Sequence, residues 1–497
     1  MIRNLLIPFA LGASLWAQQA PVPAPPKPPA DPAPPIVKHQ EITLNGKVLK
    51  YTSTTGLMPI RNGSGEIEAT IFYMAYTLDG VPDTKKRRLM FSFNGGPGSA
   101  SVWLHMGALG PKRVRMMDNG ALPPAPYQLE TNPATWLDET DLVFIDPVGT
   151  GYSRATKPEL NKKFSSVKGD IESVGEFIRL YLGRNSRWLS PLFLVGESYG
   201  TTRAAGLSGH LIEKGIALNG VLLISTVLNF QTLSFDQGND LPYELFLPTY
   251  TATAWYHKKL PADLQQKDLK TVLHEAEQWA AGGYAQVLGR GDLLTAEERT
   301  AAAKQLARFT GLPQKYVEQS DLRVEIMKFI RELRRDENVT AGRLDSRLTG
   351  PSPREATDSA EFDPSMTAIR PPYTAAFNYY VRTELGYESD LDYFILGGGI
   401  ARWNWGDENR YADVSESLRS AFAKNPHMKL YVGAGYYDLA TPYFAAGYTL
   451  NHMKLPAGAK DNIRMHYYEA GHMYYIDVTP LAALKRDAAS FIRWAAQ

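Results

Sequence analysis

The chain has 497 residues, and its 53 Lys and Arg residues almost balance its 52 Asp and Glu residues, which leaves a formal net charge of +1. This balance gives no reason to expect nucleic acid or an anionic membrane as a partner. The absence of cysteine excludes disulfides, thiol catalysis and thiolate metal ligands. No pair of histidines has metal-ligand spacing with a carboxylate nearby, so we expect no metal and no other cofactor.

Residues 1–17 have the order of a secretory signal peptide. A short start containing Arg3 precedes an apolar run from Leu5 to Trp16, and small and polar residues follow from Ala17. The run is shorter than the roughly 20 residues that cross a bilayer, so an uncleaved anchor is the weaker alternative. We expect export to a bacterial periplasm or to the extracellular space, with no integral membrane span once the signal is removed. Residues 18–36 are rich in proline and predict an extended linker.

The first folded segments read as strands. Glu41–Tyr51 and Glu66–Tyr76 flank the turn-forming residues 61–65 and predict an antiparallel pair at one edge of a sheet. Helical patterns over Ile171–Leu182 and Ala204–Ile212 lie between later apolar runs, and such alternation predicts an α/β fold with a mainly parallel sheet covered on both faces. The later runs of strand length are Leu89–Phe93, Leu142–Ile145, Leu192–Val195, Val221–Ile224, Lys429–Val432 and Ile463–Tyr468.

Residues 231–394 interrupt this alternation. Three charge-rich stretches predict helices, and a passage rich in Pro, Arg and Ser extends from them through Pro372. Because strands of the core type resume only afterwards, we interpret the region as a largely helical cap inserted between core segments 37–230 and 395–497. An independent second domain is the alternative. The three helical stretches are Asp263–Trp279, Thr295–Phe309 and Asp321–Glu337.

The strongest local signal for chemistry is the segment Pro-Leu-Phe-Leu-Val-Gly-Glu-Ser-Tyr-Gly at 191–200. An apolar strand runs into Gly-x-Ser-x-Gly and then into a helix, which is typical of the turn that lifts a nucleophilic serine into reach of a base. Gly196 and Gly200 supply the missing side chains that such a turn requires. The pattern predicts Ser198 as nucleophile and the backbone N–H of Tyr199 as a donor to the oxyanion.

A serine of this kind requires a carboxylate and a histidine later in the chain. Asp438 follows the predicted strand Lys429–Val432, and His472 follows Ile463–Tyr468. Both therefore lie on loops at the carboxyl ends of strands, where catalytic groups of open α/β sheets gather. We predict a triad of Ser198, Asp438 and His472 on an α/β-hydrolase fold.

A second glycine-rich turn, Asn-Gly-Gly-Pro-Gly at 94–98, follows the predicted strand Leu89–Phe93. Such a turn can direct backbone N–H groups at a substrate oxygen, and Gly96 is the expected second oxyanion donor. A phosphate cradle is the rival interpretation. No Gly-Lys-Ser/Thr follows the turn, and Pro97 removes a donor, so we do not adopt it.

Together, the segments 94–98, 196–199 and 471–473 with Asp438, in this order, resemble the serine carboxypeptidase family of the α/β-hydrolase superfamily, in a bacterial-type member. The resemblance implies a secreted peptidase that removes C-terminal residues from peptide substrates through an acyl-enzyme on Ser198. It also implies that Asn94 and Glu197 bind the terminal carboxylate of the substrate. A glutamate can bind a carboxylate only if the two share a proton, because two nearby negative charges repel.

One position departs from the family. Ala108, in Met-Gly-Ala-Leu-Gly-Pro at 106–111, stands where the family has a second glutamate. We expect weaker selectivity for free C-termini and a less acidic pH optimum. His105, three residues before Ala108, either replaces the missing carboxylate partner or, as the favoured alternative, fills space beside the turn. An esterase, aminopeptidase or acyltransferase on the same triad remains an alternative activity, and a catalytically dead binding protein is a further one.

Overall fold

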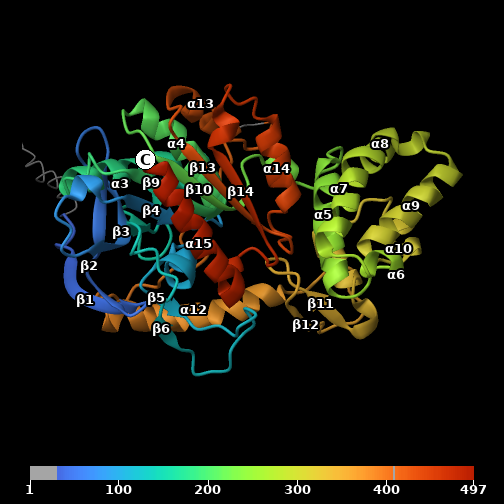
Figure 1. Ribbon diagram of the computed structural model, residues 1–497, viewed down its shortest axis with the longest axis horizontal. Coiled ribbons are helices and arrows are strands. Elements are labelled where there is room, and N and C mark those ends of the chain that lie inside the picture. The colour runs from blue at the N-terminus through green and yellow to red at the C-terminus, as the bar shows by residue number, and fades with distance from the viewer. Residues whose placement is uncertain (1–30, 407–408) are drawn as a thin grey trace, which may run out of the picture.

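The computed structural model describes residues 31–406 and 409–497, so the predicted signal peptide and most of the predicted linker lie outside the described residues. A ten-stranded sheet forms the centre of the larger body (Figure 1). Its order is β1-β2-β3-β7-β4-β9-β10-β13-β14, and the short β8 (Arg154–Ala155) pairs with β3. The strands are β1 (Ile36–Leu44), β2 (Lys47–Arg61), β3 (Ile67–Leu78), β4 (Leu89–Phe93), β7 (Asp141–Ile145), β9 (Leu192–Ser198), β10 (Gly220–Thr226), β13 (Lys429–Gly435) and β14 (Ile463–Tyr468).

From β7 to β14 every neighbouring pair is parallel, whereas β1, β2 and β3 pair antiparallel at the other edge. Each of the six apolar runs that the sequence identified as a strand after residue 88 is a strand of this parallel part. The prediction of a mainly parallel sheet with an antiparallel edge is confirmed. The parallel strands place their carboxyl ends, and the loops that follow them, along one rim of the sheet.

The N-terminal edge differs from the prediction in one respect. Glu41–Tyr51 is not one strand, because the chain reverses at Asn45 and Gly46, where φ is 50° and 76°. Asn-Gly tolerates the left-handed backbone of a two-residue hairpin turn, and this signal was available in the sequence. The predicted turn at 61–65 does connect two strands, β2 and β3.

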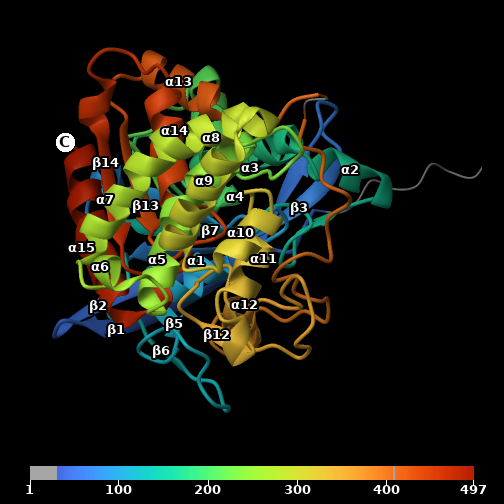
Figure 2. The same cartoon turned by 90° about the vertical axis from the view of Figure 1, so that its right-hand side faces the viewer.

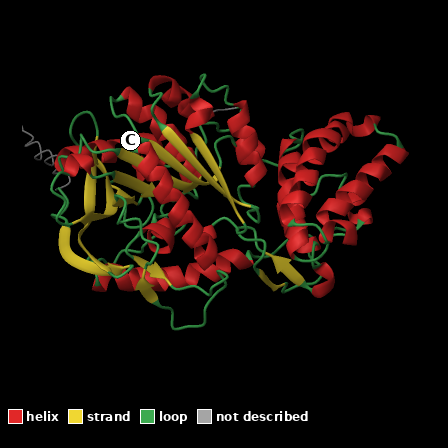
Figure 3. Cartoon of the chain, viewed as in Figure 1, coloured by secondary structure: helices red, strands yellow, loops and turns green. Residues whose placement is uncertain are grey.

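Both faces of the sheet are covered by helices, as Figure 3 shows. Alternate residues of β9 enter different clusters: Phe193 and Val195 pack on one face, Leu192 and Leu194 on the other. The first cluster includes α12 (Pro364–Thr383) and α15 (Val478–Ala495), and the second includes α3 (Val167–Arg184), α4 (Tyr199–Glu213) and α13 (Ser415–Lys424). Strands buried on both faces explain why they appear in the sequence as continuous apolar runs.

A second lobe stands beside the sheet and is built almost entirely of helices, as Figure 2 shows from its outer side. It has a hydrophobic cluster of its own, in which Tyr250 stacks on Phe329 with ring centroids 4.0 Å apart. Its helices are α5 (Leu241–Tyr256), α6 (Ala262–Gln265), α7 (Leu269–Trp279), α8 (Ala285–Arg290), α9 (Ala296–Thr310), α10 (Gln314–Gln319) and α11 (Ile326–Glu332). The residue limits that we gave to the cap remain an interpretation.

Local geometry shortens two of the predicted helices in this region. Asp263–Trp279 is split into α6 and α7 because Asp268 caps the N-terminus of α7, accepting the Thr271 N–H at 3.1 Å. The predicted helix at Asp321–Glu337 begins only at Ile326, since Asp321 and Leu322 both have positive φ. Thr295–Phe309 matches α9, which starts with a capping box.

The Pro-rich passage ends inside a long helix. Pro371 and Pro372 both lie within α12, whose Tyr373 and Phe377 are buried against the main core and not in the helical lobe. The remaining elements are short or peripheral: β5 (Lys112–Val114), β6 (Leu129–Thr131), β11 (Val339–Ala341), β12 (Thr349–Pro351), α1 (Val102–Leu104), α2 (Asn161–Phe164) and α14 (Tyr443–His452). Among the residues described here, no helix has both the length and the apolar character needed to cross a bilayer.

Candidate active site

Ser198 occupies a strained turn between β9 and α4. Its φ of 60° and ψ of −131° are unusual for a residue with a side chain. The turn is tight enough that a Cβ on Gly196 would lie 2.1 Å from the carbonyl oxygen of Gly200. Only glycine fits at 196, and Ser198 is held at the rim of the sheet, as the sequence pattern predicts.

Asp438 and His472 come together on the loops after β13 and β14. The Nδ1 of His472 lies 2.7 Å from Oδ2 of Asp438, and both side chains are buried. The other carboxylate oxygen, Oδ1, accepts the N–H groups of Ala440 and Thr441 at 2.8 and 3.0 Å. Because Nδ1–H of His472 donates to Asp438, the Nε2 of the ring is left to act as a base.

Ser198 and His472 line one cavity of about 200 Å3, together with Asn94, Gly96, Glu197 and Tyr199. Burial alone lowers the pKa of His472, but the charge of Asp438 and the hydrogen bond to it outweigh burial and raise the pKa above its ordinary value. A more basic imidazole is better able to take a proton from the serine hydroxyl. Every predicted site residue except Asp438 therefore contributes directly to this cavity, and Asp438 lies behind His472.

The two residues predicted as oxyanion donors line the same cavity. Tyr199 is the first residue of α4, so its N–H has no partner within the helix. The glycine-rich turn lies directly against it, since a Cβ on Gly95 would come within 2.4 Å of the Tyr199 nitrogen. Gly96, with φ of 100°, follows in that turn and lines the cavity. Two backbone N–H groups beside a strained serine can stabilise a negative oxygen.

Asn94 and Glu197 are both almost fully buried and both line the cavity. The side-chain oxygen of Asn94 accepts the Leu104 N–H at 3.0 Å, while its Nδ2 has no hydrogen-bond partner. Burial raises the pKa of Glu197 to about 7, although the nearby His472 and a hydrogen bond from the Tyr475 hydroxyl lower it in part. An unpaired amide donor beside a readily protonated carboxyl group can bind an anionic carboxylate.

Arg203 holds the first residue of the glycine-rich turn in place. Its guanidinium donates to Asp170 at 2.8 Å and to the backbone oxygen of Asn94 at 2.5 Å, and all of these groups are buried. The ion pair of Arg203 with Asp170 therefore fixes the start of the turn that contains Gly96. No motif in the sequence signals this role, because Arg203 lies inside the helix after the serine.

Asp146 fixes the far end of the same turn. Its Oδ1 accepts both the backbone N–H and the hydroxyl of Ser101 at 2.8 Å, and burial raises its pKa to about 6. A Cβ on Gly151 would lie 1.8 Å from the other carboxylate oxygen, so glycine is required at 151. The segment 146–153 therefore supports the turn and does not line the cavity.

A segment of the insertion connects the two loops that carry Asp438 and His472. The N–H of His472 donates to the Leu344 oxygen at 2.6 Å, and the N–H of Leu439 donates to the Arg343 oxygen at 3.0 Å. Asp345 accepts the Gly471 N–H at 3.2 Å. Sequence reasoning missed this segment because the contacts join residues more than 90 positions apart.

The apolar wall of the cavity was also missed. Its members come from separate elements, including α12, so no single window of sequence displays them: Trp103, Phe230, Leu233, Met366, Ile369, Leu396 and Met473. Arg343 and Leu344 line the same cavity. The wall provides space for the side chains of a substrate on an apolar surface.

His105 does not reach the cavity. It is buried in the π-helical turn His105–Leu109, stacks on Phe144 at 4.2 Å and shares a hydrogen bond of 2.8 Å with the Tyr76 hydroxyl. Burial lowers its pKa to about 3, so it stays neutral. The space-filling role is the one that the structure supports, and Ala108 is buried in the same turn.

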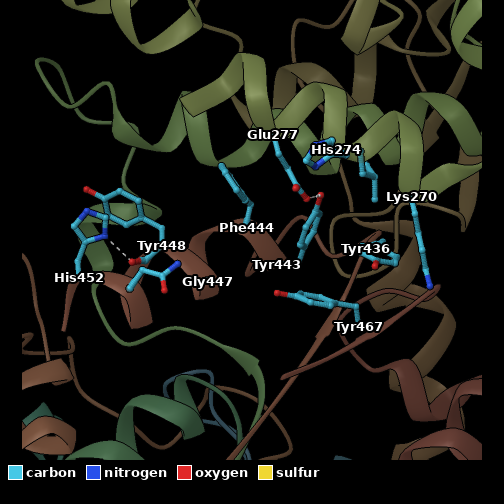
Figure 4. A pocket seen from close by; sticks show the side chains of 12 residues that line it. Lys270, His274, Glu277, Tyr436, Tyr443, Phe444, Gly447, Tyr448, His452 and Tyr467 are labelled. Atoms are coloured by element: carbon cyan, nitrogen blue, oxygen red, sulfur yellow. Dashed lines mark hydrogen bonds between the residues drawn. The ribbon is translucent and has the colours of Figure 1, made fainter. Parts of the chain in front are cut away.

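A second cavity, of about 450 Å3, lies between α7 of the helical lobe and α14 (Figure 4). Within it the Tyr443 hydroxyl donates to Glu277 at 2.7 Å, and the rings of Tyr436 and Tyr467 stack with centroids 5.7 Å apart. None of the predicted site residues lines it. Within the described part of the chain no group of three metal-ligating side chains occurs either.

A parallel sheet that carries a serine turn, an aspartate loop and a histidine loop at the carboxyl ends of β9, β13 and β14 has the α/β-hydrolase fold. The crystal structure of Kex1ΔP, a prohormone-processing carboxypeptidase from Saccharomyces cerevisiae, shares this fold with a TM-score of 0.50 and 16% identity. The match covers 88% of this chain and 91% of that one.

The sequence model described as serine carboxypeptidase matches residues 45–479. The chain belongs to the serine carboxypeptidase family. Among its curated relatives, serine carboxypeptidase-like 3 from Arabidopsis thaliana is 30% identical over 137 residues, which is 27% of this chain and 29% of that protein. The serine carboxypeptidase S10 family member 1 of Dictyostelium discoideum is 25% identical over 199 residues, 39% of this chain and 43% of that protein. The chain thus aligns with less than half the length of these relatives.

Proposed function

We propose that this protein is a serine-type carboxypeptidase that removes C-terminal residues from peptides, with Ser198, His472 and Asp438 as its triad. One observation carries the proposal. The serine with its base and a buried pair suited to a carboxylate, Asn94 and Glu197, line a single cavity of about 200 Å3. The family membership of the chain supports the same activity.

In the proposed reaction, the Ser198 hydroxyl attacks the carbonyl carbon of the last peptide bond while Nε2 of His472 takes its proton. The N–H groups of Gly96 and Tyr199 stabilise the negative oxygen of the tetrahedral intermediate. His472 then gives the proton to the leaving amine, which departs as the free C-terminal amino acid. Water attacks the acyl-enzyme by the same route and releases the shortened peptide.

The C-terminal carboxylate of the substrate is recognised by the other two residues. The Nδ2 of Asn94 donates to it, and Glu197 donates a second hydrogen bond when it is protonated. Because burial raises the pKa of Glu197 to about 7, the carboxyl group remains protonated up to near-neutral pH. The raised pKa supports a pH optimum of peptide hydrolysis that is less acidic than the optimum expected from a pair of ordinary carboxyl groups.

The test is a set of blocked dipeptides that differ only in a free or amidated C-terminus. The proposal expects higher kcat/KM for the free carboxylate, through a lower KM, and loss of all hydrolysis in Ser198→Ala. Asn94→Leu keeps the side-chain size and removes the donor, so it should reduce the preference. Equal rates on both peptide types would instead favour an esterase, aminopeptidase or acyltransferase.

Labelling with a fluorophosphonate separates an enzyme from a binding protein on an inactive scaffold. Wild-type protein should be labelled and Ser198→Ala should not. If neither is labelled, the binding-protein alternative replaces the proposal. The strained turn and the buried His472–Asp438 pair, joined at 2.7 Å, favour a reactive serine.

We further propose that the protein is exported. The apolar run Leu5–Trp16 and the proline-rich stretch after it support export, although the run and most of that stretch lie outside the described residues. Cell fractionation of a tagged chain, compared with a chain lacking residues 1–17, tests this directly. Recovery of both forms in the cytoplasm would contradict it.

A further inference from the structure

Glu197 accepts a hydrogen bond from a buried donor on the protein side, the hydroxyl of Tyr475. Tyr475 lies three residues after His472, is fully buried, and donates to Oε2 of Glu197. Its ring and the Tyr373 hydroxyl occupy the space beside Gly107, where an added Cβ would lie 2.5 Å from each. Gly107 adjoins Ala108, the position at which the resemblance to the family led us to expect a second carboxyl group.

A tyrosine and a carboxyl group differ as partners for Glu197. A second carboxyl group competes with Glu197 for one proton, and the pair titrates together. A tyrosine hydroxyl at this depth stays protonated, since burial and the charge of Glu197 raise the pKa of Tyr475 well above its ordinary value. The hydroxyl therefore keeps its proton and donates it to Oε2, which favours Oε1 as the oxygen that takes the proton Glu197 gains.

We propose that Tyr475 is a positioning residue for carboxylate recognition: by donating to Oε2 it directs the proton of Glu197 to Oε1, where it is offered to the substrate's C-terminal carboxylate. The inference rests on the proposed function and assigns a role in it to a residue that no sequence motif marks. It names the substrate class as peptides with a free C-terminal carboxylate.

The surroundings of Glu197 limit what else could take this role. The charged or titratable groups around it are His472 and Asp438, whose effects on its pKa oppose one another, and the buried tyrosines. Asn94, whose Nδ2 has no hydrogen-bond partner, lines the same cavity. Arg343 also lines the cavity, but it is exposed, and its charge lowers the pKa of His472. The side chains that interact with Glu197 through charge or hydrogen bonding are Asn94, Tyr373, Asp438, His472, Tyr474 and Tyr475.

The test compares Tyr475→Phe with the wild type on free-carboxylate peptides across pH. Loss of the hydrogen bond should raise KM about 3- to 10-fold at acidic pH, the range of one hydrogen bond, with a smaller change in kcat. Because the hydroxyl stabilises the ionised form of Glu197, its loss raises that pKa, and the alkaline limb of kcat/KM moves to higher pH. A tyrosine that only filled space would leave the position of this limb unchanged.

Tyr474→Phe is the matched control. Tyr474 is the adjacent buried tyrosine, its hydroxyl has no hydrogen-bond partner, and it does not line the cavity. Its variant loses the same oxygen atom and should leave the alkaline limb in place. Fluorophosphonate labelling shows that each variant retains a reactive serine.

If Tyr475→Phe fails to fold, 3,5-difluorotyrosine at position 475 keeps the shape and makes the hydroxyl more acidic. A stronger donor should move the alkaline limb to lower pH, the direction opposite to that of Phe. The inference is overturned if the limb stays fixed in either variant that folds while wild type prefers free carboxylates. A wild type without that preference overturns the proposed function itself, and this is visible before any variant of Tyr475 is compared.

Discussion

Replacing Glu197 with Gln should stabilise the protein at neutral and alkaline pH, because the fold opposes ionisation of this buried carboxyl group. Burial raises its pKa from 4.5 to about 7. Since one pKa unit corresponds to about 1.36 kcal/mol, the difference amounts to about 3 kcal/mol of unfolding free energy.

The sign follows from proton binding. Below about pH 4 both folded and unfolded chains hold the proton, and Glu197 has no effect through ionisation. As the pH rises through 4.5 the unfolded chain loses the proton first, so the folded state loses stability until about pH 7, after which the loss is constant. Gln cannot ionise, so the stability of Glu197→Gln relative to wild type should grow by about 3 kcal/mol between acidic and alkaline pH.

Urea unfolding of both proteins at about pH 4 and about pH 8, followed by tryptophan fluorescence, measures this change. Any fixed cost of the amide, such as a poorer contact with Tyr475, is the same at both pH values and cancels. Glu41→Gln, an exposed exchange on β1, controls for the substitution itself. Unfolding midpoints of wild type and Glu197→Gln that remain parallel across this range would refute the reasoning, and with it the protonated Glu197 on which carboxylate recognition depends.

Three further predictions follow from the site. The pH profile of kcat/KM for free-carboxylate peptides should be bell-shaped near neutral pH. His472, with its raised pKa, must be neutral, and Glu197, with a pKa of about 7, must be protonated. Amidated peptides should lack the alkaline limb, and identical profiles for the two peptide types would contradict this. Arg203→Leu should lower the unfolding free energy by about 3–5 kcal/mol by leaving Asp170 buried and unpaired. The double variant with Asp170→Leu should recover part of that loss in urea unfolding, whereas additive losses would argue against the pairing. Gly196→Ala should reduce the rate of fluorophosphonate labelling about 100-fold or more, because its Cβ would lie 2.1 Å from the Gly200 oxygen and displace Ser198; unchanged labelling would show that the turn can relax.

The relation between sequence and fold varies with the range of the interactions. The parallel strands were predictable because strands buried on both faces must be continuously apolar, as in Leu89–Phe93, whose bounds match β4. The helix expected at Asp321–Glu337 was too long because composition does not reveal a positive φ at Asp321. The hairpin turn at Asn45 and Gly46 was a local signal that the prediction of one strand overlooked.

The candidate site divides in the same way. Gly-x-Ser-x-Gly is constrained by the geometry of a turn only five residues long, so sequence alone determined where the serine and its glycines stand. Sequence also determined that Asp438 and His472 follow strands, which brings them to the rim of the sheet. Only the tertiary structure decided that His472 pairs with Asp438 at 2.7 Å, that residues 343–345 join their loops, and that Tyr475 donates to Glu197. These contacts depend on packing between segments tens to hundreds of residues apart, and short-range pattern and spacing carry no information about such packing.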